Sequence, residues 1–168
     1  MKNHVITSIT AIVFSLFLAA SFTASVSAQE YEALKGVQTV KTIFDFRDGN
    51  TEIAPIHLNL VYDTYKDQAI RSVSEKPEFV VVFMDVSVLL LSSNRDKFSD
   101  EEKKRLAEFD KTISAMAKDG IRFEVCMFAM EVLGVDPETI APEIHRVGNG
   151  WIASLGYQQR GYSVIPAY

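Results

Sequence analysis

The sequence predicts an α/β fold with a mainly parallel five-stranded sheet and helices on both faces. Short segments rich in β-branched and aromatic residues alternate along the chain with longer segments of helical character. The strongest short segment, residues 79–84, is apolar at every position, as a strand covered by helices on both sides must be. Strands separated by helices pair in parallel, because each crossover returns the chain to the same edge of the sheet.

The first 28 residues are typical of a secretory signal peptide. Lys2 is the only Lys, Arg, Asp or Glu in this segment, a mostly apolar run follows from Val5 to Ala20, and Val26-Ser27-Ala28 is a small-x-small cleavage pattern. We expect cleavage between Ala28 and Gln29 and a periplasmic or secreted product. The alternative is an uncleaved membrane anchor, for which the apolar run is short.

Residues 29–168 are expected to form a single α/β domain. The chain is 48% hydrophobic and 23% charged, which is typical of a globular protein. Its net charge is −5, and removal of Lys2 with the leader leaves 16 basic and 22 acidic residues, or −6. This acidic balance argues against nucleic acid as a partner. No second long apolar segment exists, so no membrane contact is expected after cleavage.

The first strand is predicted at residues 38–46, where β-branched and aromatic residues end at the turn-forming run 47–50. Residues 55–73 are predicted to form one long helix. Pro55 lies in its first turn, where the missing N–H is not needed for the helix. The second strand follows at residues 79–84.

Residues 86–91 are apolar, and this short run fits either a short helix or more strand. The next helix, residues 99–118, is marked more clearly. Ser99 and Glu102 form a capping box at its start, and Gly120 stops it. One face of this helix carries the apolar side chains of Leu106, Phe109, Ile113 and Met116.

The rest of the chain continues the alternation. The predicted elements are, in order, a strand at 121–126, a helix at 128–133, a helical turn at 137–140, a strand at 143–147, a helix at 151–160 and a strand at 162–165. Glycines mark the turn before the last helix and its end. In such a sheet, ligands and chemistry collect at the carboxyl ends of the strands.

The residues expected at that edge come from the strand ends and the turns after them. They are Asp45, Arg47, Asp85, Cys126, Asn149 and Gly150, with His57 close by at the start of a helix. His57 and His145 have no metal-ligand spacing to each other or to the cysteine, and no Gly-rich phosphate loop follows the first strand. No metal and no cofactor are therefore expected.

Cys126 is the only cysteine in the chain, which excludes an intramolecular disulfide framework. It shares one face of its predicted strand with Arg122 and Glu124, while the apolar side chains share the other. It also directly precedes a helix, whose first amides and positive dipole end favour a thiolate. The alternative is a buried, inert cysteine, which is the usual state of a free cysteine.

The residues expected near Cys126 at this edge have opposite effects on the protonation of its thiol. Asp45 and Asp85 favour the neutral thiol, whereas Arg47 and His57 would offset them if they approach. The turn Gly148-Asn149-Gly150 offers amides that could hold an anion or a sulfur species. The alternative for this turn is a plain connection in which Asn149 caps the following helix.

Two parts of the sequence resemble the DsrE/DsrF-like family, most closely its small secreted bacterial branch. One part is Val125-Cys126 with a short helix that ends in Leu133-Gly134-Val135. The other joins Gly148-Asn149-Gly150-Trp151 to a tail that runs from Tyr157 to Tyr162. The resemblance covers roughly residues 39–166.

This resemblance implies a three-layer α/β/α sandwich that assembles into trimers or hexamers. In the cytoplasmic sulfur-relay members of the family, the cysteine that matches Cys126 carries a persulfide. The resemblance thus implies at most a sulfurtransferase-like sulfur carrier, with an unknown protein as sulfur donor or acceptor.

Two hypotheses follow from the sequence. In the first, Cys126 accepts a sulfane sulfur and passes it on, with Gly150 and neighbouring amides stabilising charge. In the second, the protein is a non-catalytic oligomeric binding module, and Cys126 only packs in the interior. A redox protein that forms intermolecular disulfides is less well supported, because the chain has no second cysteine to resolve such a bond.

Overall fold

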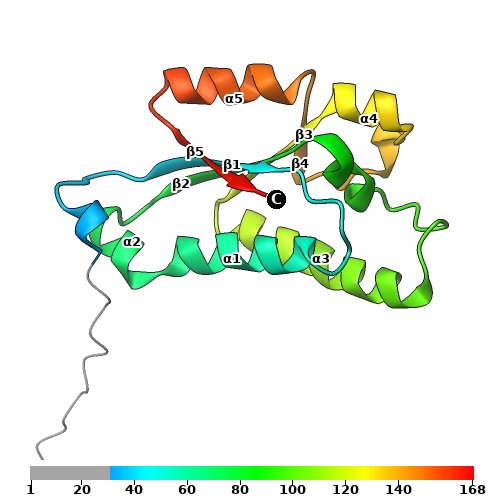
Figure 1. Ribbon diagram of the computed structural model, residues 1–168, viewed down its shortest axis with the longest axis horizontal. Helices are drawn as coiled ribbons and strands as arrows, with labels where there is room; N and C mark the ends of the chain where they lie inside the picture. The colour runs from blue at the N-terminus through cyan, green and yellow to red at the C-terminus, as the bar shows by residue number, and fades with distance from the viewer. Residues whose placement is uncertain (1–30) are drawn as a thin grey trace, which may run out of the picture.

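The computed structural model describes residues 31–168, and the leader predicted at residues 1–28 lies outside them. All five strands form one parallel sheet in the order β4-β3-β2-β1-β5. Figure 1 shows α1 and α3 on one side of this sheet and α5 on the other. The prediction of an α/β fold with helices on both sides of a five-stranded sheet is confirmed.

The strands are β1 (Lys41–Phe46), β2 (Glu78–Phe83), β3 (Arg122–Cys126), β4 (Ile144–Val147) and β5 (Ser163–Ala167). The α-helices are α1 (Ala54–Lys66), α2 (Gln68–Val73), α3 (Asp100–Lys118), α4 (Met127–Leu133) and α5 (Gly150–Gln159). Three short 3₁₀ helices complete the set, namely η1 (Glu32–Leu34), η2 (Asp85–Leu91) and η3 (Pro137–Thr139). Within residues 31–168, no helix is both long and apolar enough to cross a membrane.

Three local predictions needed correction. The first strand begins at Lys41, three residues later than predicted. The single helix predicted over residues 55–73 is two helices, because Asp67 leaves the helical conformation and caps α2 by accepting a hydrogen bond from the Ala69 amide at 2.7 Å. The last strand is displaced toward the C-terminus, to Ser163–Ala167, and includes Pro166. A proline is tolerated there because β5 is an edge strand. The run 86–91, which the sequence left open, lies in the 3₁₀ helix η2.

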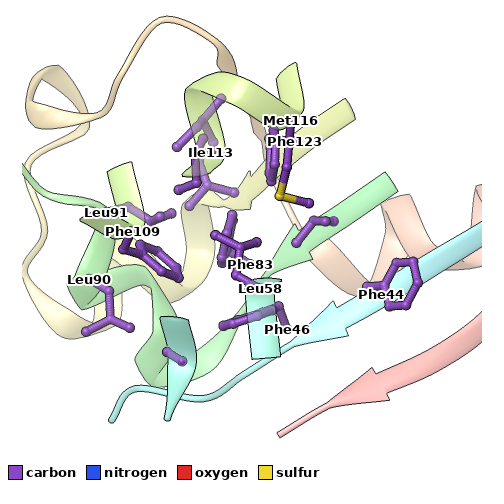
Figure 2. Packing of buried hydrophobic residues seen from close by; sticks show 14 of the residues in the cluster. Phe44, Phe46, Leu58, Phe83, Leu90, Leu91, Phe109, Ile113, Met116 and Phe123 are labelled. Carbon is purple, nitrogen blue, oxygen red and sulfur yellow. The ribbon is translucent and has the colours of Figure 1, made fainter. Parts of the chain in front are cut away.

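The larger core lies between the sheet and the helices α1 and α3. Its centre is aromatic: the rings of Phe46 and Phe83 lie 5.1 Å apart, and the ring of Phe109 lies 6.2 Å and 6.1 Å from them (Figure 2). The capping box at Ser99 is formed as predicted. This cap marks the start of α3. The apolar face predicted for α3 is buried and consists of Leu106, Phe109, Ile113 and Met116.

The opposite face of the sheet is covered by α5 over a smaller apolar cluster. This cluster contains Ile43, Val80, Val82, Met84, Cys126, Tyr157 and Tyr162. Cys126 therefore lies on the face of the sheet that carries the smaller apolar cluster. The helix that covers it is α5, and the start of α5 sets the geometry around the sulfur.

Candidate functional site

Cys126 is the last residue of β3 and the N-cap of α4, and only 5% of its surface is exposed. Its Sγ accepts a hydrogen bond from the backbone N–H of Gly150 at 3.2 Å. The sequence offered two sources of amides for the sulfur, the start of α4 and the turn at Gly150, and the structure uses the second. The Phe128 amide donates to the Gly148 carbonyl at 3.1 Å, and the amide that reaches the sulfur is the first of α5.

A side chain at Gly150 would require the side chain of Met84 to move. A Cβ placed there would overlap with Met84 Sδ, would lie 2.6 Å from Met84 Cγ and would lie 3.2 Å from Cys126 Cβ. The absence of a side chain therefore allows the helix to begin in direct contact with Met84, which follows β2, and with Cys126 at the end of β3. Asn149 caps the same helix by accepting a hydrogen bond from the Trp151 amide at 2.8 Å. The side chain of Asn149 thus has the capping role that was one of the two readings of this turn.

A cavity of about 280 Å³ opens beside the sulfur. It brings together four of the residues predicted from the sequence, Cys126, Arg47, Asp85 and Asn149. Apolar side chains from two helices supply much of the remaining wall, among them Phe128, Val132 and Trp151. Asp85 enters the wall from a left-handed backbone conformation, with φ of 57°. The cavity is small and mostly apolar, and its wall contains one cationic side chain, Arg47, and one anionic side chain, Asp85.

Asp45 and His57 do not line this cavity. Asp45 accepts hydrogen bonds from Arg47 Nε at 2.9 Å and 3.1 Å, and this contact raises the pKa of the guanidinium despite its partial burial. His57 Nδ1 lies 3.1 Å from Asp48 Oδ2. Within residues 31–168, no group of three or more His, Cys, Asp or Glu side chains is arranged to hold a metal ion.

Glu124 was not proposed as a site residue, yet it lies on the same strand face as Cys126 and is only 3% exposed. Its Oε1 accepts hydrogen bonds from Arg122 Nε and from the Tyr157 hydroxyl, both at 2.7 Å. Its Oε2 is buried with no hydrogen-bond partner among the described residues. The alternation of charged residues along β3 marked this face, but it did not reveal that α5 covers it.

Tyr157, in the C-terminal part of α5, binds the helix to the sheet because its hydroxyl donates a hydrogen bond to the Glu124 carboxylate of β3. Burial of the phenol, together with its hydrogen bond to Glu124, raises the pKa of Tyr157 to about 12. Contact with Glu124 likewise raises the pKa of Arg122. Sequence reasoning missed this cluster, because Tyr157 and Glu124 are 33 residues apart.

The model of the DsrE/DsrF-like family matches residues 22–167 of the chain. The chain belongs to this family. The resemblance carried by Cys126 and the C-terminal tail is thereby confirmed at the level of the sulfur-relay-related family. The match also includes residues 22–28, the last part of the predicted leader.

A solved structure shows that the fold of this DsrE-family chain occurs elsewhere. MTH1491 from Methanobacterium thermoautotrophicum, described as a protein of unknown function, superposes with a TM-score of 0.59 at 16% sequence identity. The alignment covers 76% of this chain and 98% of that protein. At this identity the likeness shows the shared fold alone. A search of curated proteins finds no match.

The contact between Gly150 and Met84 yields a first prediction. In Gly150→Ala, the new methyl group must displace the buried Met84 side chain or shift α5, and we expect the free energy of unfolding to fall by about 1–3 kcal/mol. Gly156→Ala is the matched control in the same helix, because nothing lies within 4 Å of its Cβ position. That variant should be unchanged or more stable by up to about 1 kcal/mol. Urea denaturation measures both, and equal effects would contradict the prediction.

A second prediction concerns pH. Because the pKa of Tyr157 is raised in the folded state from 10.0 to about 12, its contribution to stability is complete below pH 10 and is lost as the pH rises toward 12. Tyr157→Phe should cost about 1–3 kcal/mol at neutral pH, since Glu124 loses a donor. The difference from the native protein should shrink across that pH window. Tyr31→Phe, at an exposed tyrosine, is the control. A difference that stays constant with pH would refute the assignment.

Proposed function

We propose that this DsrE-family protein carries sulfane sulfur as a persulfide on Cys126, in the periplasm or outside the cell. The observation that carries the proposal is the hydrogen bond from the Gly150 amide to Cys126 Sγ at the wall of an open cavity. A backbone N–H at the first position of a helix stabilises negative charge on a sulfur atom. Membership of a sulfur-relay-related family supports the same chemistry.

The chemical step requires no oxidant. The thiol of Cys126 loses its proton to solvent, and the thiolate attacks the terminal sulfur of a donor persulfide, R–S–SH. A bond forms between Sγ and that sulfur, the donor S–S bond breaks, and the donor leaves as the thiolate R–S⁻. The sulfane sulfur keeps its oxidation level throughout. Transfer to an acceptor thiolate repeats the step with Cys126 as the leaving group.

The cavity suits this cargo. A persulfide is only one sulfur atom longer than a thiol, and the apolar walls formed by Phe128, Val132 and Trp151 favour soft, weakly hydrated sulfur. Arg47 supplies a positive charge on the same wall, but the nearby carboxylates of Asp45 and Asp85 offset much of this charge. The Gly150 amide is therefore the principal group that stabilises charge on the sulfur.

Reaction with inorganic polysulfide tests the proposal. Intact-mass spectrometry of the native protein should show an adduct of one sulfur atom, removed by a reducing agent and absent in Cys126→Ser. Gly156→Ala, which leaves the site untouched, should form the adduct as the native protein does.

A different result would contradict the persulfide proposal. No adduct on the folded protein, together with alkylation of Cys126 only after unfolding in urea, would establish the alternative of a structural cysteine in a non-catalytic binding module. The small exposed fraction of Cys126 is the observation that favours this alternative.

We also propose that the protein forms a homo-oligomer, a trimer or hexamer as the family resemblance implies, through the outer face of α4 and α5. Five large apolar side chains there are more than half exposed: Phe128, Val132, Trp151, Ile152 and Leu155. Three of them also border the Cys126 cavity. Several exposed apolar side chains on neighbouring elements are typical of an interaction site.

A charge placed on that face should dissociate the assembly. Ile152, 70% exposed on α5, is replaced in Ile152→Lys, which should give monomers in native mass spectrometry. Ile56→Lys is the matched control, since Ile56 is 61% exposed on α1, on the other side of the sheet. A monomeric native protein, or dissociation by the control alone, would contradict the proposed interface.

A further inference from the structure

A second cleft lies at the opposite edge of the sheet, around the amino ends of β2 and β3. Its volume is about 740 Å³, and none of its lining residues belongs to the Cys126 cavity. It is formed by the segment from Glu75 to Val80, the start of β3, and Tyr157, Arg160 and Tyr162 from the end of the chain. At about 3.3 Å per residue, the length of β2 separates the two edges of the sheet by about 17 Å.

The cleft contains the arginines that have no carboxylate partner. Within residues 31–168, five of the seven arginines lie within 4.0 Å of an Asp or Glu oxygen. The two exceptions are Arg71 and Arg160, and both line this cleft. Two unpaired guanidinium groups in one cleft of an acidic chain are an arrangement that attracts anions.

Both guanidinium groups are held against tyrosine rings. Arg71 lies over Tyr65 at 4.6 Å, and Arg160 lies over Tyr157 at 5.1 Å and over Tyr162 at 5.6 Å. The rings are themselves fixed, because each hydroxyl donates a hydrogen bond, Tyr65 to the Asp119 carbonyl, Tyr157 to Glu124 and Tyr162 to Glu78. Stacking uses the flat face of a guanidinium and leaves its N–H edge free of the ring. Arg71 donates one of these N–H groups, on Nη1, to the Glu75 carbonyl at 2.5 Å, and its other N–H groups stay available to an oxyanion.

The acidic residues of the cleft do not cancel these charges. Glu78 pairs with Lys41 at 2.8 Å and accepts a hydrogen bond from the Tyr162 hydroxyl at 2.5 Å, and these two contacts, with a smaller contribution from the charge of Arg160, lower its pKa. The ammonium group of Lys41 offsets the negative charge of Glu78. Arg122 is balanced by Glu124. Three cationic lining residues, Arg71, Lys76 and Arg160, then face two anionic ones, Glu75 and Asp119.

We propose that this cleft binds a small organic oxyanion, a compound with a phosphate or carboxylate group, through the guanidinium groups of Arg71 and Arg160. The volume is far larger than a bare phosphate and lies in the range of small-molecule sites. The tyrosine walls accommodate the organic part of such a ligand. The site is independent of Cys126, so it gives the protein a ligand-binding function separate from sulfur transfer.

The test uses three probes, inorganic phosphate, citrate and adenosine monophosphate, each added to the protein up to about 10 mM. The Nε–H resonances of the arginines are followed by NMR. Adenosine monophosphate or citrate should shift the resonances of Arg71 and Arg160 and should bind more tightly than inorganic phosphate. Arg71→Gln and Arg160→Gln should each weaken binding by about tenfold or more, because each removes one charge-assisted contact.

Two control variants separate the outcomes. Arg146→Gln removes the same charge from an arginine paired with Glu138 on another part of the surface and should leave binding unchanged. Cys126→Ser should also bind normally, so the result does not depend on whether the protein carries sulfur. If none of the probes shifts Arg71 and Arg160, or if Arg146→Gln weakens binding as much as the two cleft variants, the proposal is wrong.

Discussion

Helix α5 is held against the sheet at both of its ends, and the candidate site depends on this attachment. At the start, Gly150 lies against Met84 and donates its amide hydrogen to Cys126 Sγ. Further along, the hydroxyl of Tyr157 donates to the buried carboxylate of Glu124. Because α5 covers the central strands on its face of the sheet, these two contacts fix both the cover over the sulfur and the donor that reaches it.

The two faces of the sheet are built differently. The face under α1 and α3 carries a large core with an aromatic centre, which stabilises the fold mainly by burial of apolar surface. The face under α5 carries a small apolar cluster beside the buried carboxylate of Glu124, which pairs with the exposed side chain of Arg122. A buried carboxylate stabilises a fold little by itself but requires its hydrogen-bond donors in place, so the contact of Glu124 with Tyr157 favours a defined position for α5. The outer surface of α5 remains apolar and exposed.

Local sequence predicted the elements whose causes are local. The capping box at Ser99 and the apolar spacing that follows it predicted α3 with its buried face, because both signals lie within a few residues. Alternation along β3 correctly assigned Glu124 and Cys126 to one face. The break at Asp67 was missed, because apolar residues at helical spacing continue on both sides of it. Periodicity also left η2 open, since a short apolar run fits more than one structure.

By itself, the sequence determined the order of strands and helices, the parallel sheet and the position of Cys126 at its carboxyl edge. Only the tertiary structure decided that the amide of α5, and not that of α4, meets the sulfur, and that Arg71 and Arg160 share a cleft without acidic partners. The physical reason is distance along the chain. A strand pattern tells which way a side chain points, but the group that it meets comes from 24 residues away for Cys126 and 33 for Glu124. Packing of the whole domain brings such groups together.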